Sequence, residues 1–152
     1  MWPDTREKVD IELALLQRLL DSHRPILEKV RHAEPDTIEL SALSACLHAF
    51  YTGIEGIFKR IALEIDRTIP TGDRWHSDLL MQMARPSSYR RPVISSDLCT
   101  TLTEYLEFRH VFRHAYTFDL KWNKMSGLIL HCEETLKQLE TELQVFFESE
   151  NL

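Results

Sequence analysis

The amino-acid sequence predicts an all-α protein, an antiparallel four-helix up-and-down bundle with one short extra helix. Apolar residues recur at helical spacing over several long stretches, and the short connections between these stretches favour antiparallel neighbours. Only four glycines and six prolines are present in 152 residues, too few for the many turns of an all-β fold. This length suits one hydrophobic core, so we expect a single domain over residues 1–152.

The first helix is expected to begin after a cap at Asp4 or Thr5 and to reach about Val30. Pro25 lies within it and removes one backbone hydrogen bond, which predicts a kink near residues 21–23. The apolar positions of this helix are Val9, Leu13, Leu16, Leu20 and Leu27.

A second, longer helix is expected over residues 36–65, where an apolar stripe continues for about eight turns without a proline. Pro35 and Asp36 are suited to break the chain and to start this helix. Gly53 and Gly56 lie inside it, and each costs about 1 kcal/mol relative to alanine. We interpret these glycines as a place where a neighbouring helix or a second subunit approaches closely.

Two connections and a short helix are expected next. Residues 68–74 are rich in turn formers, and a serine or aspartate can cap a short helix over residues 77–83. The loop that follows, residues 85–92, carries three arginines and a tyrosine. It is either a solvated connector or an arm that holds phosphates, in which case Arg90 and Arg91 are the contacts.

The next helix is expected to start after a cap at Ser95 or Ser96 and to carry Arg109 in its last turns. A helix break is expected at residues 116–119. One last helix over residues 120–147 then completes the bundle. Its apolar positions are Trp122, Met125, Ile129, Cys132, Leu136, Leu139, Leu143 and Phe146.

Positive charge is concentrated in one part of an otherwise acidic chain. The formal net charge of −6 at pH 7 argues against a surface that binds nucleic acid everywhere. Residues 85–124 nevertheless contain seven lysines and arginines against four acids. Contact with phosphates is therefore expected to be local to this segment.

The cysteines and the first residues indicate a cytoplasmic protein. Cys46, Cys99 and Cys132 are far apart and odd in number, which argues against a disulfide framework or a zinc site. The polar start of the chain predicts no secretory leader, and the chain has no run of about 18 apolar residues that could span a membrane.

The densest group of reactive side chains is Arg-His-Val-Phe-Arg-His-Ala-Tyr at residues 109–116. The Arg109 guanidinium is permanently charged and matches phosphate oxygens, while the His114 imidazole can exchange a proton near neutral pH. Such a pair suits cleavage of RNA by its own 2′-hydroxyl, with His114 moving the proton and Arg109 stabilising charge at phosphorus. This chemistry requires neither a metal nor another cofactor.

Residues around this pair are candidates for a supporting role. His110, Arg113, Arg90 and Arg91 are predicted to help bind RNA. One Arg–His pair makes a modest active site, so we expect a homodimer in which two copies face one cleft. The same spacing is also compatible with a helix end that merely carries solvated charges, in which case Tyr116 is a half-buried core aromatic.

Residues 109–116 resemble the Arg-x4-6-His motif of HEPN domains, including the histidine directly after the arginine. The added Ala-Tyr resembles the longer Arg-x4-His-x-Tyr form of HepT toxins. Residues 50–58, Phe-Tyr-Thr-Gly-Ile-Glu-Gly-Ile-Phe, are similar to the aromatic-Gly-Ile/Leu-Glu stretch on the long helix of HepT-like proteins. The resemblance covers essentially the whole chain and implies a bundle of HEPN type.

The resemblance implies a metal-independent ribonuclease toxin that acts on tRNA or mRNA, not on DNA, as a homodimer. It also implies a minimal nucleotidyltransferase antitoxin that transfers AMP to Tyr116. The added phosphates would lie where RNA has to approach Arg109 and His114. As an alternative, some HEPN proteins are non-catalytic modules that bind nucleotides or dock onto a nucleotidyltransferase.

Overall fold

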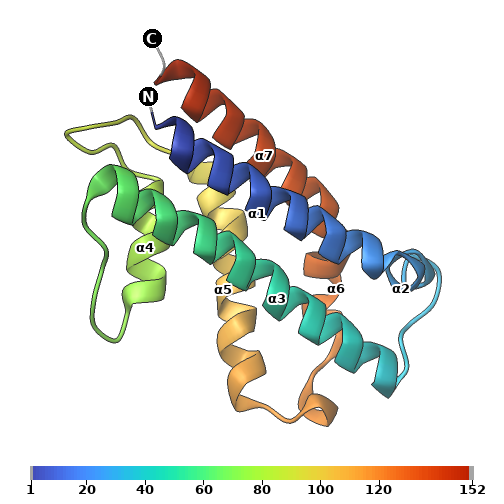
Figure 1. Ribbon diagram of the computed structural model, residues 1–152. Helices are drawn as coiled ribbons and strands as arrows, with labels where there is room; N and C mark the ends of the chain where they lie inside the picture. The colour runs from blue at the N-terminus through green and yellow to red at the C-terminus, as the bar shows by residue number, and fades with distance from the viewer. Residues whose placement is uncertain (1, 151–152) are drawn as a thin grey trace.

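Seven α-helices make up the computed structural model of the chain, which describes residues 2–150 (Figure 1). In chain order they are α1 (Pro3–Ser22), α2 (Arg24–Lys29), α3 (Thr37–Ile61), α4 (Trp75–Met83), α5 (Ser96–His114), α6 (Trp122–Leu130) and α7 (Cys132–Ser149). A π-helical turn, η1 (Ala62–Asp66), extends α3, and a 3-10 turn, η2 (Thr117–Asp119), precedes α6. The described residues form no β-strand, so the prediction of an all-α protein is confirmed.

The longest of these helices, α3, lies at the centre of the packing. It contacts α1, α4, α5 and α6. In Figure 1, α1 runs antiparallel to α3 on one side and to α7 on the other, while α5 crosses them instead of running alongside. The four-helix up-and-down arrangement of HEPN type stays a prediction. The largest fully buried side chains are Tyr51, Tyr105, Phe50, Phe58, Phe146 and Phe147.

The start of α3 is fixed by its own sequence. The Asp36 carboxylate accepts a hydrogen bond from the Glu39 backbone N–H (2.8 Å), and the Glu39 carboxylate accepts one from the Asp36 backbone N–H (3.0 Å). This reciprocal capping satisfies two of the backbone donors that a helix start leaves free. The expected beginning of the long helix at Asp36 is therefore confirmed, and η1 carries it through Asp66.

A close approach of two helices occurs at one of the two glycines in α3. A Cβ atom added at Gly53 would lie 2.5 Å from Cδ2 of Leu16 in α1, whereas one added at Gly56 would meet nothing within 4 Å. The expected approach by a neighbouring helix therefore holds for Gly53 and not for Gly56.

The first helix begins earlier than predicted. It starts at Pro3, with Trp2 at the N-cap in the left-handed region of backbone space, at φ 58°. The predicted cap Thr5 is buried, and its hydroxyl donates to the Glu64 carboxylate (2.8 Å). Asp4 and Thr5 therefore belong to the first turn, where proline is favoured at the first helical position.

Two of the expected long helices are broken. At His23, α1 ends and α2 begins with Pro25 in its first turn, so the predicted kink is a complete break. A second break at His131, with φ −110° and ψ 6°, separates α6 from α7, and the expected continuous helix over residues 120–147 is wrong. Apolar residues keep helical spacing across His131, so their periodicity carries no sign of the break: Met125, Ile129, Cys132 and Leu136.

Candidate functional site at the end of α5

The motif residues occupy the last turns of α5 and the segment after it. Ser95 caps the helix, as expected, because its hydroxyl accepts a hydrogen bond from the Leu98 backbone N–H (3.1 Å). The helix ends at His114, Ala115 is extended and η2 follows, so the break expected at residues 116–119 is confirmed. In Figure 1 this end of α5 projects beyond the neighbouring helices.

Helical spacing distributes the motif over two faces of α5. Arg109 and Arg113 are four residues apart and share one face. His110 and His114 share another, and their ring centroids are 4.8 Å apart. Arg109 and His114 are five residues apart, so their side chains leave the helix in different directions.

A cavity of about 560 Å³ lies between the start of α4 and the last turns of α5. Three of the predicted site residues line it, namely Arg109, His110 and Arg113. His76 and Ser77 from α4 belong to the same wall. We call this space the Arg109 cavity.

Arg109 is half-buried, and its positive charge acts on a histidine of α3. Its Nε atom is buried and has no hydrogen-bond partner within the described part of the chain. The pKa of His48 on α3 is lowered, mainly because the imidazole is partly desolvated and also because Arg109 and Arg113 are positively charged. Because Arg109 also lines the cavity, its guanidinium group suits an anionic ligand such as phosphate.

The Arg109 cavity also contains a histidine held by a buried carboxylate. Nδ1 of His76 lies 2.7 Å from Oε2 of Glu55, which projects from α3. The Glu55 side chain is only 5% exposed, and that of His76 is 22% exposed. The Trp75 ring stacks on the imidazole with 3.6 Å between centroids.

This pair was not predicted from the sequence. The short helix was expected to start at Ser77, but it starts at Trp75, which places His76 in the first helical turn. The sequence does contain one indication of such a pair. Glu55 lies on the buried side of a long apolar helix, and a buried carboxylate needs a partner.

The other two motif residues do not line the Arg109 cavity. His114 and Tyr116 are both exposed, and neither belongs to its wall. The Tyr116 ring is 73% exposed and stacks against Phe118, itself 72% exposed, with centroids 5.3 Å apart. The alternative that Tyr116 is a half-buried core aromatic is therefore wrong.

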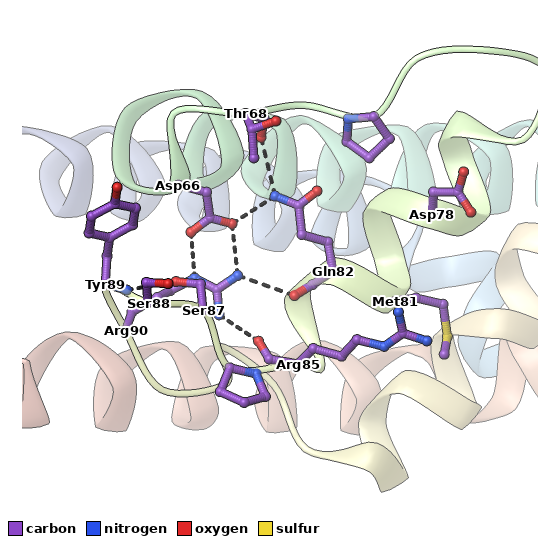
Figure 2. Close-up of a pocket in the computed structure, with 12 residues that line it drawn as sticks. Asp66, Thr68, Asp78, Met81, Gln82, Arg85, Ser87, Ser88, Tyr89 and Arg90 are labelled. Atoms are coloured by element: carbon purple, nitrogen blue, oxygen red, sulfur yellow. Dashed lines mark hydrogen bonds and ion pairs between the residues drawn. The ribbon is translucent and has the colours of Figure 1, made fainter.

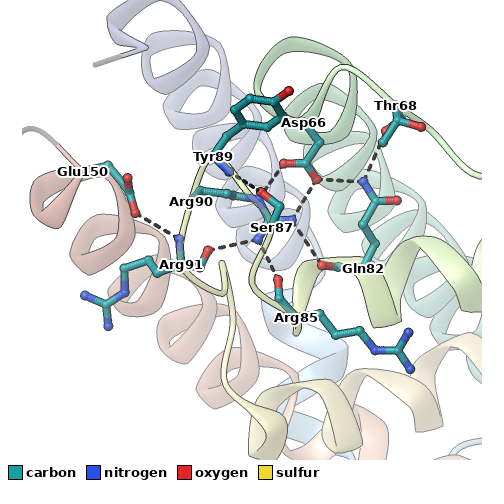
Figure 3. A network of polar contacts seen from close by, with 9 residues as sticks. All are labelled: Asp66, Thr68, Gln82, Arg85, Ser87, Tyr89, Arg90, Arg91 and Glu150. Atoms are coloured by element: carbon teal, nitrogen blue, oxygen red, sulfur yellow. Dashed lines mark hydrogen bonds and ion pairs between the residues drawn. The ribbon is translucent and has the colours of Figure 1, made fainter.

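Arg90 occupies a buried position instead of the surface position that RNA binding requires. Its side chain is 1% exposed, and Nε and Nη2 donate to the two carboxylate oxygens of Asp66 at 2.6 Å and 2.8 Å (Figure 2). Its remaining donors reach backbone carbonyls of the loop and of α4 (Figure 3). Arg90 therefore anchors the loop over residues 85–92 to the end of η1, and we correct its expected role in RNA binding.

Arg91 is exposed but lies apart from the Arg109 cavity. Figure 3 shows its side chain pointing away from the buried network, while its backbone N–H donates to the Glu150 carboxylate (3.2 Å). It lines a different cavity, of about 380 Å³, beside α7. The structure therefore brings together Arg109, His110 and Arg113, but not Arg91.

The three cysteines are free and buried. Burial raises the pKa of Cys46 to about 12 and that of Cys132 to about 11, and it also raises the pKa of Cys99. These thiols are thus poor nucleophiles at neutral pH. The described residues contain no group of three or more His, Cys, Asp or Glu side chains arranged to hold a metal ion. Nor does any helix in this part of the chain have the length and apolar character needed to cross a membrane.

The fold and the end of α5 define an all-helical protein with a cluster of arginines and histidines at a helix end. The model of the HepT-like protein family matches residues 42–149, and the chain belongs to this family. The predicted resemblance to HepT-like proteins is thereby confirmed, and this family is one of HEPN-type toxin–antitoxin modules. Neither the curated proteins nor the solved structures include a significant match to the chain.

Proposed function

We propose that this protein is a metal-independent RNA endonuclease and the toxin of a toxin–antitoxin pair, with tRNA or mRNA as its substrate. The observation that carries the proposal is the wall of the Arg109 cavity, where Arg109, His110 and Arg113 come together from one helix end. Membership in the HepT-like family supports the same assignment.

In the proposed reaction, Arg109 binds the scissile phosphate and stabilises the charge that develops on its oxygens. A charge-stabilising donor of this kind contributes about 10² to 10³-fold to the rate. His114 moves a proton, which contributes about 10² to 10⁴-fold. His110 and Arg113 hold the flanking phosphates in the same cavity, and Arg91 meets the RNA farther along its path.

The proposed active site requires two copies of the chain. His114 does not line the Arg109 cavity of its own protomer, so a homodimer that brings two α5 ends together would complete the site. Exposed apolar side chains at this end, Val111, Tyr116 and Phe118, support such an interface. Each protomer is then one HEPN-type bundle over residues 1–152 that acts in the cytoplasm.

The direct test is RNA cleavage by the purified protein in the presence of EDTA. We expect Arg109→Ala and His114→Ala each to lower the cleavage rate by at least about 10²-fold, and to abolish growth arrest on expression. Matched controls are Arg18→Ala on α1 and His32→Ala in the turn before α3, both at exposed positions. If the Arg109 and His114 variants cleave RNA and arrest growth like the parent, the motif is not the active site.

We propose that a minimal nucleotidyltransferase antitoxin inactivates the protein by transferring AMP to Tyr116. The exposure of this phenol supports the proposal because a second enzyme has to reach it. After incubation with the partner and ATP, the intact mass should rise by adenylyl units in the parent and in Tyr89→Phe, another exposed tyrosine. A rise that persists in Tyr116→Phe would place the modification elsewhere.

A second candidate function is a non-catalytic module that docks onto the nucleotidyltransferase. The position of His114 outside the Arg109 cavity favours it, since one protomer does not combine the two motif side chains. This function predicts a tight complex with the partner and no RNA cleavage by the free protein in any oligomeric state.

A further inference from the structure

We propose that His76, oriented by Glu55, is a second proton-transfer residue of the Arg109 cavity, an inference that rests on the ribonuclease function proposed above. His76 comes from α4 and Arg109 from α5, yet both line the same space of about 560 Å³. Each protomer therefore places an imidazole beside the phosphate-binding guanidinium without any contribution from His114.

The contact with Glu55 determines which ring nitrogen of His76 is available. A carboxylate only accepts hydrogen bonds, so the 2.7 Å contact places a hydrogen on Nδ1. Nε2 is then the nitrogen that can take up a proton. Glu55 acts as a positioning residue, in the way that the aspartate of a Ser-His-Asp triad fixes the orientation and tautomer of its histidine.

Packing holds the imidazole in this orientation. The Trp75 ring stacks on His76, and the ammonium group of Lys59 lies 4.4 Å from the centroid of a Trp75 ring. The His76 side chain nevertheless keeps 22% of its surface exposed, so part of the ring is reachable from the cavity. A histidine that served only to neutralise Glu55 would not need to share a cavity wall with Arg109.

Charged and titratable groups lie around His76 on every element packed against it. Glu55 and Lys59 belong to α3, and Asp73 precedes α4. The groups from α5 that line the cavity are Glu107, Arg109, His110 and Arg113. The arginines offer a place for the phosphate, while Glu55 keeps the imidazole next to that place.

The proposed step moves one proton at each end of the phosphodiester. Nε2 of neutral His76 takes the proton of the 2′-hydroxyl while the 2′-oxygen forms a bond to phosphorus. The bond between phosphorus and the 5′-oxygen breaks, and the leaving oxygen receives a proton from protonated His114. The products are a 2′,3′-cyclic phosphate and a 5′-hydroxyl, and both histidines return to their starting state by exchange with water.

The first test is the rate of RNA cleavage by His76→Gln as a function of pH. Glutamine keeps an N–H that can donate to Glu55 but cannot take up a proton. We expect kcat to fall by about 10² to 10⁴-fold with little change in KM. The decrease in rate toward acidic pH, which protonation of the base causes in the parent, should disappear. Glu55→Gln, which keeps His76 but loses the charge, should lower kcat by a smaller factor.

The matched control is His131→Gln. This histidine also lies near a carboxylate, with Nδ1 3.4 Å from the Glu134 side chain, but it is outside the Arg109 cavity. We expect it to retain the parent rate. A cooperative thermal unfolding transition shows that His76→Gln, Glu55→Gln and His131→Gln are each folded. If His76→Gln does not fold, the kinetics of Glu55→Gln provide the test.

The second test uses an oligoribonucleotide in which sulfur replaces the bridging 5′-oxygen at the mapped cleavage position. The sulfur leaves without being protonated, so His114→Ala should regain cleavage and His76→Gln should not. Rescue of His76→Gln would contradict its role as the base.

Parent-like kcat and pH dependence in His76→Gln, with Arg109→Ala and His114→Ala inactive, would remove His76 from the reaction and leave the ribonuclease function intact. Absence of RNA cleavage by the parent would overturn both proposals.

Discussion

Adjacent arginines in one loop have opposite environments. Arg90 is buried against Asp66, whereas the neighbouring Arg91 is exposed. Taking a guanidinium and a carboxylate out of water costs several kcal/mol for each ion, and their attraction and hydrogen bonds offset this cost only while both are present. The loop over residues 85–92 is therefore sensitive to substitution at one arginine and tolerant at the next.

Replacing Arg90 should strongly destabilise the fold. Arg90→Ala leaves the Asp66 carboxylate, 3% exposed, without a positive charge beside it and with only the Gln82 amide as a side-chain donor, and we expect the free energy of unfolding to fall by about 3–5 kcal/mol. Arg91→Ala removes an exposed side chain and should change the free energy of unfolding by no more than about 0.5 kcal/mol. Urea unfolding followed by circular dichroism measures both. Equal effects of the two substitutions would show that the buried ion pair does not stabilise the loop.

The candidate site could be predicted from the sequence only where its residues are close along the chain. Arg109, His110 and Arg113 were found because helical spacing joins them within two turns. Glu55 and His76 are on separate helices, and only the packing of α4 against α3 brings them together. Arg90 was misassigned because composition does not distinguish a buried arginine from an exposed neighbour.

At the scale of the helix, replacing either glycine of α3 by alanine is expected to change stability, and the two changes have opposite signs. Gly53→Ala forces a Cβ atom against Leu16, a 3% exposed core residue, and overpacking of this kind costs about 1–3 kcal/mol. Gly56→Ala meets open space on an exposed helix position and should stabilise the protein by up to about 1 kcal/mol. Thermal unfolding of the two variants should therefore shift the midpoint in opposite directions. A higher midpoint for Gly53→Ala would mean that Leu16 moves away at no cost.

The helix starts that could be predicted from the sequence are those at which a side chain caps the first turn. Asp36 and Glu39 cap α3, and Ser95 caps α5, so both starts follow from side chains next to the backbone groups that they satisfy. The break at His131 has no proline nearby, and the buried residues on both sides keep one periodicity. The division of the last helix into α6 and α7 therefore has no signal in the apolar periodicity of the sequence.

At the scale of the whole molecule, the proposed homodimer depends on the exposed end of α5. Val111→Asp places a charge on this end and should convert the dimer to a monomer, because a buried unpaired carboxylate is costly. Val145→Asp on α7 is the matched control, since the two valines are 51% and 50% exposed. Light scattering coupled to size-exclusion chromatography measures the mass. A parent that is monomeric at assay concentration would contradict the shared active site.

The match to the HepT-like family begins at residue 42, after α1 and α2, yet these helices belong to the same core. Val9, Leu13, Leu16 and Leu20 of α1 are buried, and α1 contacts both α3 and α7. We therefore keep the proposal of a single domain over residues 1–152. Its packing unit is larger than the part that the family model covers.

The helix α1 also brings the two ends of the chain together. The Trp2 ring stacks on Phe146 with 6.2 Å between centroids, and Arg6 pairs with Glu148 at 3.7 Å. Figure 1 shows the start of α1 and the end of α7 side by side, away from the projecting end of α5. A fluorescent reporter fused to either terminus would therefore leave the α5 end open, so that protein level and growth arrest can be followed together in single living cells.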